Sequence, residues 1–247
     1  MRRPRLLPTL ASLLAFAFLL SLGNWQMARL EWKQSLMARV DSRLQASQID
    51  LPPAGKWTML AQADYDYRPV RLTGQFDHAD ELYWYAGAYA GRTGVQVITP
   101  FRLAGGGVVL VNRGFVPEAL RDPSQRLQGQ IRGAVTVSGL MRWPSSRSRF
   151  DAPDDPGQRL WFVKDLAAMS EQLGYATAPF FVELDANSTI AGGPVGGQTR
   201  VSFSNRHLEY ALTWYGLAVT LVIVFILWQV LPSRRDGRDE ASVPTDE

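Results

Sequence analysis

Two long apolar segments lie near opposite ends of this 247-residue chain. The first, residues 6–22, carries no charged side chain and follows a short arginine-rich start. The second, residues 210–231, ends at Pro232. As a helix, the second segment would be about 33 Å long, which is enough to cross the hydrocarbon core of a bilayer. The pattern therefore predicts two membrane-spanning helices.

The first segment could instead be a cleaved signal peptide. The apolar core of a signal peptide is usually about 7 to 15 residues long and is followed by a small-residue cleavage site. This segment is longer, and it continues into a stretch in which Trp25 and Trp32 alternate with Arg29 and Lys33. Aromatic and basic residues at helical spacing are typical of a helix that leaves a membrane. The pattern favours a permanent anchor.

Arginines flank both apolar segments on the sides nearest the chain ends, at Arg2, Arg3 and Arg5 and at Arg234, Arg235 and Arg238. Basic residues next to a span favour the cytoplasmic side, so both termini are expected there. The predicted organisation is a cytoplasmic N-terminus (1–5), a first transmembrane helix (6–27), a periplasmic stalk and domain (28–206), a second transmembrane helix (207–231) and a cytoplasmic tail (232–247). In a bacterium this is a two-pass protein of the inner (cell) membrane.

Between the two segments the hydrophobic pattern changes its period. Residues 30–44 keep a helical pattern and predict a stalk that ends before Pro52 and Pro53. Alternating or apolar runs then predict strands, with a hairpin at Gly105, Gly106 and Gly107. The strand segments are 70–76, 82–85, 95–101, 108–116, 135–141, 160–163 and 180–184. The expected fold is a membrane-anchored α+β protein, with two transmembrane helices bracketing a mostly antiparallel β domain, barrel-like or sandwich-like.

One helix is expected inside the β domain, over residues 166–173. Asp165 precedes it as a capping residue, and Gly174 follows it as a terminator. Residues 143–158, which are rich in proline, glycine and serine, predict a long loop before this helix.

Composition removes several classes of function. The chain has no cysteine, so disulfides, thiolate metal sites and cysteine catalysis are excluded. The glycine clusters lack the spacing and neighbours of phosphate-binding loops, and there is no G-x-S-x-G elbow for a hydrolase. The net charge is only +3 and no basic run is interleaved with aromatic residues, so nucleic acid is not an expected partner. We expect a protein that is not an enzyme.

The chain contains two histidines, His78 and His207. His78 lies among Asp77, Asp80 and Glu81, a set that could bind a metal or act as an acid and base. Because these residues are contiguous and lie between two predicted strands, a polar turn with solvated charges is the favoured interpretation.

His207 lies at the start of the second apolar segment, where Ser204 or Asn205 could cap the helix. The positive end of the helix dipole favours a neutral imidazole, which is the ligand form. Ala211 and Trp214 follow on the same helical face and leave room for a flat apolar ring. An interfacial histidine without a ligand is the alternative, and the residues alone leave both open.

Four strings together carry a family resemblance. LGNWQMARLEWK (22–33), RPVRLTGQFDHADEL (68–82), the segment 94–117 with ITPF and VNRGFVP, and NRHLEYALTWYGLA (205–218) are similar to motifs of the Surfeit locus protein 1 family, called Shy in yeast. In that family two membrane helices bracket a domain in the intermembrane space or periplasm. The resemblance weakens over residues 121–178 and at YWYAGAYAG.

The resemblance implies an assembly factor for haem-copper cytochrome c oxidase that binds haem a and assists its insertion into, or stabilisation in, the catalytic subunit. His207 matches the family's ligand histidine and would be an axial ligand of the haem iron. From their expected membrane depth alone, Trp25, Tyr210, Trp214 and Tyr215 would flank the ring, and Arg29 and Arg206 could meet its carboxylates. Arg113 and Gly114 match the family motif and could form a structural corner or hold a propionate, the corner being preferred.

The implied partners are the membrane and subunit I of cytochrome c oxidase, with haem A synthase and a second copy of this chain as further candidates. The competing hypothesis is a scaffold without a cofactor, which docks oxidase subunits through its periplasmic domain. Under that hypothesis His207 only packs at the membrane interface.

Overall fold

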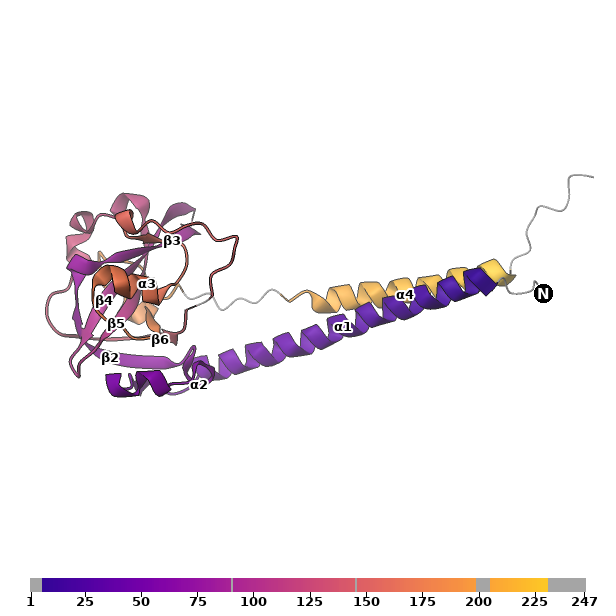
Figure 1. The fold of residues 1–247 in the computed structure, drawn as a ribbon, viewed down its shortest axis with the longest axis horizontal. Coiled ribbons are helices and arrows are strands. Elements are labelled where there is room, and N and C mark those ends of the chain that lie inside the picture. Colours follow the sequence, from indigo (N-terminus) through magenta and orange to yellow (C-terminus); the bar gives the residue numbers. More distant parts are fainter. Residues whose placement is uncertain (1–5, 90, 145, 199–204, 231–247) are drawn as a thin grey trace, which may run out of the picture. The chain divides into compact units, whose positions relative to one another are not determined.

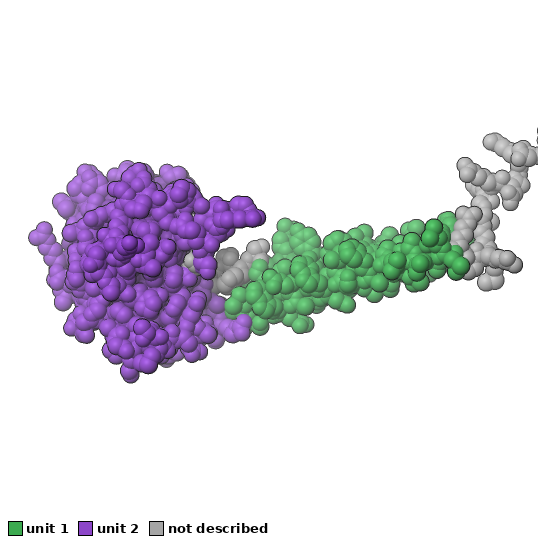
Figure 2. All heavy atoms as spheres, in the orientation of Figure 1, with its two compact units in different colours: residues 1–38, 202–247 green, residues 39–201 purple. Residues whose placement is uncertain are grey.

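The computed structural model describes residues 6–89, 91–144, 146–198 and 205–230 (Figure 1). The chain divides into two compact units, which Figure 2 shows in different colours. One unit comprises residues 1–38 and 202–247, and the other comprises residues 39–201. We describe each unit by itself.

Two long helices make up most of the first unit, and residues 39–44 of the longer helix belong to the second unit. α1 (Leu6–Leu44) has 39 residues and α4 (His207–Val230) has 24, and both are long and apolar enough to cross a membrane. The predicted anchor and the predicted stalk are therefore one continuous helix, which ends before the two prolines. Most of the large apolar side chains of α4 face outward, as do those in the first part of α1. Such surfaces require apolar surroundings, which supports membrane anchoring.

Small residues lie where α1 and α4 meet. Gly23 is buried against the ring of Tyr215, and Ala211 and Ala218, one heptad apart, are also buried. Small side chains let two helix backbones approach closely, a common feature of helix pairs in membranes. The hydroxyl of Tyr215 donates a hydrogen bond to Asn24 Oδ1 at 2.8 Å.

The second unit contains a mixed β-sheet. Its described strands are β1 (Ile49–Asp50), β2 (Pro69–Phe76), β3 (Leu82–Tyr89), β4 (Arg92–Leu103), β5 (Val108–Pro117), β6 (Val135–Arg142), β7 (Leu160–Trp161) and β8 (Phe181–Leu184). They pair in the order β1-β2-β6-β8-β5-β4-β3-β7. β2 also pairs with β4, so β2, β6, β8, β5 and β4 form a closed circuit of pairings. The pairs β1–β2, β3–β7 and β5–β8 are parallel, whereas the other described pairs are antiparallel.

Short helices connect the strands. They are η1 (Ala54–Met59), α2 (Gln62–Tyr65), η2 (His78–Asp80), η3 (Glu118–Leu120), η4 (Pro123–Gly129), η5 (Pro156–Gln158), α3 (Leu166–Leu173) and η6 (Ala186–Ser188). The predicted hairpin at the three glycines joins β4 to β5, as expected. The strand predicted over 160–163 is shorter, because only Leu160 and Trp161 pair with β3.

The period of two along the strands divides the core into two clusters. Val109 and Val111 of β5 lie in one cluster, while Leu110 between them lies in the other. Phe181 of β8 joins Leu110, whereas its neighbour Val182 joins the two valines. The second cluster also contains Leu166 and Met169, so α3 covers one face of the sheet.

The predicted ends of α3 are confirmed. The side chain of Asp165 accepts a hydrogen bond from the amide of Ala168 at 3.1 Å, and Gly174 adopts a left-handed conformation with φ +76°. We expect Asp165→Ala to lower the free energy of unfolding by about 1 kcal/mol, because an amide of the first helical turn loses its acceptor. Urea unfolding of the full-length protein in detergent micelles, followed by tryptophan fluorescence, measures the change.

The matched control for this cap is Glu171→Ala, which removes one negative charge from the exposed side of the same helix. Alanine is favourable inside a helix, so this control should change stability by less than about 0.5 kcal/mol. Equal effects of the two substitutions would show that the cap of Asp165 does not stabilise α3.

Candidate functional site

His207 is the first residue of α4, and its ring meets a polar side chain of α1. Nδ1 of His207 lies 2.7 Å from Oε1 of Gln26. Gln26 is 9% exposed, while the imidazole is partly exposed. The amide of His207 donates to Oδ1 of Asn205 at 3.4 Å, so Asn205 contributes to the helix start. Ser204, the other capping candidate, lies outside the described residues.

The other predicted haem-site residues have partners of their own or face outward. Trp25 is 55% exposed and Tyr210 is 50% exposed, and Trp214 is partly buried. The guanidinium of Arg29 lies 4.4 Å from the ring centre of Trp32, and Arg206 forms an ion pair with Glu209 at 3.0 Å. Within the described residues, no hydrogen bond or ring contact joins these side chains to His207. The structure brings His207 together with Gln26 instead.

Sequence reasoning did not single out Gln26. The available signal was an amide side chain directly after Trp25, near the end of the apolar run and at the same expected membrane depth as His207. A buried polar group in such a helix needs a hydrogen-bond partner, and few polar side chains are available at that depth.

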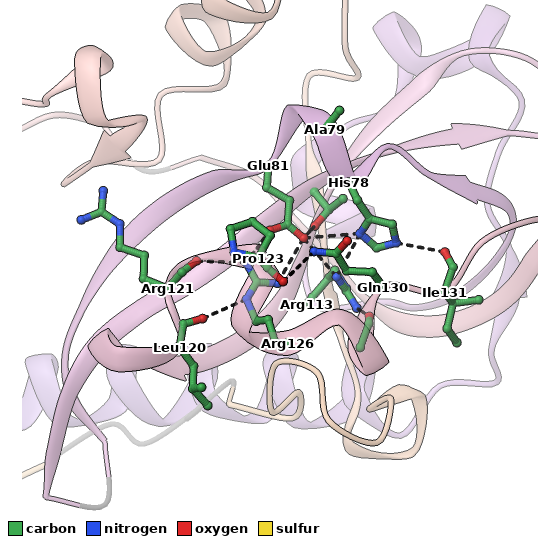
Figure 3. Close-up of polar contacts among 12 residues, drawn as sticks. His78, Ala79, Glu81, Arg113, Leu120, Arg121, Pro123, Arg126, Gln130 and Ile131 are labelled. Atoms are coloured by element: carbon green, nitrogen blue, oxygen red, sulfur yellow. Dashed lines mark hydrogen bonds and ion pairs between the residues drawn. The ribbon is translucent and has the colours of Figure 1, made fainter.

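The other histidine lies in a buried network of charges. Figure 3 shows the Glu81 cluster, which we define as His78, Glu81, Arg113 and Arg126. Glu81, Arg113 and Arg126 are 2%, 1% and 3% exposed. Glu81 Oε1 lies 3.2 Å from Arg113 Nη1, and Oε2 lies 2.5 Å from Arg126 Nη2. His78 Nδ1 lies 3.4 Å from Glu81 Oε1, and Nε2 donates to the carbonyl of Ile131 at 3.0 Å.

A β-bulge explains how Arg113 reaches this cluster. On β4, Val97 faces Gly114 and the next residue, Ile98, faces Asn112, so Arg113 is an extra residue on β5. A bulge redirects a side chain relative to the regular alternation. Arg113 also donates to the carbonyl of Gly129 and contacts the ring of Phe76. Because Arg113 is buried, it supports a structural corner and is not accessible to a propionate.

Glu81 and the two arginines stay charged although they are buried in the domain. Burial alone raises the pKa of Glu81, but hydrogen bonds from His78 and Arg126 and the charges of the two arginines outweigh it, so the pKa is lowered. Burial lowers the pKa of Arg113 to about 10, against the opposing effect of Glu81. At neutral pH one carboxylate thus holds two guanidinium groups. Arg126 Nε donates to the carbonyl of Leu120, whereas Arg113 Nε is buried without a hydrogen-bond partner among the described residues.

The predicted solvated turn around His78 is wrong for Glu81, which is buried. The metal alternative also lacks support, because the three carboxylates diverge: Asp77 binds Arg102, Asp80 accepts from the hydroxyl of Tyr175, and Glu81 binds the two arginines. Over the described parts of the chain, no group of three or more histidine, aspartate or glutamate side chains is placed to hold a metal ion.

Comparison with known proteins places this architecture in a family. The SURF1 family model matches residues 13–219. Surfeit locus protein 1 of Rattus norvegicus is 41% identical over 79% of this chain and 67% of its own length, and that of Homo sapiens is 38% identical over 80% and 69%. A SURF1-like protein of Monosiga brevicollis is 35% identical over 90% of this chain and 87% of its own length. The match covers the β domain and extends into both long helices, so the chain belongs to the SURF1 family.

Proposed function

We propose that this chain is an assembly factor for haem-copper cytochrome c oxidase, which carries haem A on His207 and assists its insertion into, or stabilisation in, the catalytic subunit. The observation that carries the proposal is the arrangement of His207. Its Nδ1 is engaged by Gln26, whereas Nε2 has no hydrogen bond to any described residue. An imidazole held in this way offers one nitrogen to a metal ion.

The surroundings of His207 fit a large apolar cargo better than a small ion. Leu208 and Tyr210, within three residues of it in α4, and Trp25, next to Gln26 in α1, are exposed. Glu209, the carboxylate two residues after it, is paired with Arg206. A haem would supply an iron that accepts the imidazole nitrogen, and an apolar ring that covers exposed side chains. Arg206 and Arg29 remain the proposed partners of the haem carboxylates. To bind them, the haem carboxylates would have to compete with Glu209 for Arg206 and with Trp32 for Arg29.

We further propose that the chain is a two-pass protein of a bacterial inner membrane, with both termini in the cytoplasm and residues 28–206 in the periplasm. The arginine flanks and the outward-facing apolar side chains of α1 and α4 support this topology. His207 then lies at the periplasmic surface of the membrane. Subunit I of cytochrome c oxidase is the proposed recipient, and haem A synthase is a candidate donor. Carrying a cargo requires no catalytic residue, so the proposal includes no enzymatic activity.

The test is co-expression with the enzymes of haem A synthesis, followed by purification and visible spectroscopy. We expect the wild type to copurify with haem A, and His207→Ala to retain at least about tenfold less, because loss of an axial ligand removes well over 1.4 kcal/mol of binding free energy. Circular dichroism confirms that the variant is folded.

The control for this test is His78→Gln, which removes the other imidazole and keeps an amide that can donate to the carbonyl of Ile131. This variant should bind haem like the wild type. Equal haem occupancy in the wild type and His207→Ala would show that His207 is not the haem ligand. A wild type that binds no haem and still supports oxidase assembly would establish the cofactor-free scaffold instead.

A further inference from the structure

We propose that Gln26 is a positioning residue for His207: its amide oxygen fixes the imidazole as the Nδ1–H tautomer and directs Nε2 toward the cargo. The role of the contact in haem binding rests on the proposed function, whereas the contact itself is observed between residues of this chain. Gln26 and His207 come from different helices of the same compact unit, 181 residues apart in the sequence.

Gln26 lies at a buried position of α1. Gly23, three residues before it, and Leu30, four residues after it, are also buried, so Gln26 lies on the face of α1 that packs inward. A buried amide without a partner costs about 1–3 kcal/mol, and within the described residues His207 is the hydrogen-bond partner of its side-chain oxygen. The glutamine is therefore committed to the histidine.

The direction of the hydrogen bond between Gln26 and His207 sets the tautomer of the imidazole. A carbonyl oxygen only accepts, so the 2.7 Å contact requires a proton on Nδ1 of His207. In a neutral imidazole the lone pair then resides on Nε2. Metal-binding histidines generally donate their other ring N–H to an oxygen, which sets both the tautomer and the orientation of the ring. Gln26 supplies that oxygen before any ligand arrives.

The hydrogen-bond partner of His207 is a neutral amide. A carboxylate at this place would raise the basicity of the imidazole and hold a metal more tightly, whereas an amide orients the ring without adding charge. A carrier has to release its cargo, so a neutral partner suits it. We expect haem affinity to rank Gln26→Glu above the wild type, and the wild type above Gln26→Leu.

The decisive measurement uses the full chain without haem. The chain has only two histidines, so labelling with ¹⁵N-histidine gives two ring systems, and the His78→Gln variant identifies that of His207. Long-range ¹H–¹⁵N correlation in detergent micelles, at about pH 8.5, reads the tautomer of the neutral ring. We expect the Nδ1–H form in the wild type, its loss in Gln26→Leu, and its return in Gln26→Glu, which restores an oxygen acceptor.

The matched control is Gln34→Leu, an identical change on the exposed surface of α1, which should leave the tautomer unchanged. An Nε2–H tautomer in the wild type, or the same tautomer in the wild type and Gln26→Leu, would overturn the inference. If Gln26→Leu does not fold, the wild-type tautomer and the Gln26→Glu spectrum still decide the question.

Haem titration provides the second readout. Gln26→Leu should weaken haem binding about 10- to 100-fold, the usual effect of removing such a supporting group. In the His207→Ala background the same change should have no further effect, because its target is gone. The two proposals fail separately: a wild type without haem affinity refutes the proposed function, whereas the tautomer in the haem-free protein decides the role of Gln26.

Discussion

Glu81→Gln is expected to lower the free energy of unfolding of the β domain by about 3–5 kcal/mol. The substitution keeps the size and shape of the side chain but removes the carboxylate that faces Arg113 and Arg126. Both guanidinium groups are almost fully buried, so they would remain charged without a counter-ion. Urea unfolding of the full-length protein, followed by the fluorescence of the buried Trp84 and Trp161, measures the loss.

The control is Glu118→Gln, the same chemical change in an ion pair at the surface. Glu118 lies 3.3 Å from Arg121 and its side chain is 59% exposed. Water screens such a pair, so its loss should cost less than about 1 kcal/mol. Similar losses in the two variants would contradict a special role for the buried cluster.

The stability difference between the wild type and Glu81→Gln should depend on pH. The pKa of Glu81 in the folded protein lies below its ordinary value of 4.5, so the unfolded chain takes up the proton first as the pH falls. The stability that Glu81 contributes is complete above about pH 4.5 and is lost as the pH falls through the lowered pKa. Glu81→Gln has no carboxylate at this position and therefore lacks this contribution at every pH. The difference in unfolding free energy between the wild type and Glu81→Gln should therefore shrink in this acidic range. A constant difference would contradict the lowered pKa.

Gly114→Ala should destabilise the domain by about 3 kcal/mol or more. Gly114 follows the bulge residue on β5 and has φ +115°, a conformation that side chains rarely adopt. A Cβ atom there would also overlap the carbonyl oxygen of Val195, which accepts a hydrogen bond from Phe115. Main chain cannot move aside as a flexible side chain can. Urea unfolding gives the magnitude, and circular dichroism shows whether the fold is kept.

Gly133→Ala separates the two causes. Gly133 also has a positive φ, +88°, but a Cβ atom at this position would meet no atom within 4 Å. The only cost is that alanine disfavours a positive φ, so we expect the free energy of unfolding to fall by about 1 kcal/mol. If Gly114→Ala costs no more than Gly133→Ala, the close approach of residue 195 does not restrict the strand.

Local patterns predicted the fold where neighbouring residues determine the structure. The alternation along β2, the glycine hairpin after β4 and the two ends of α3 each depend on residues close in sequence, and each prediction is confirmed. The closure of β2 onto β4, by contrast, is a pairing between distant segments. A pattern of period two shows which face of a strand is buried but does not identify its neighbour.

The candidate sites show the same division. His207 could be proposed as a candidate from the sequence because a single imidazole beside an apolar run is conspicuous. Glu81 was misjudged because its surroundings in the sequence are polar, and the arginines that bury it come from 32 and 45 residues further on. Arg113 reaches Glu81 because a bulge interrupts the alternation of side-chain directions along β5. The hydrophobic pattern of the sequence did not predict this bulge.

If the proposed function holds, the separation between Gln26 and His207 determines when during synthesis the chain becomes able to bind haem. α1 leaves the ribosome first, and the whole β domain must follow before α4 is made. Until then Gln26 has no imidazole to hold. Under the proposed function, an incomplete or truncated chain therefore cannot take up haem, so the cofactor is committed only to chains whose translation has reached the second membrane helix.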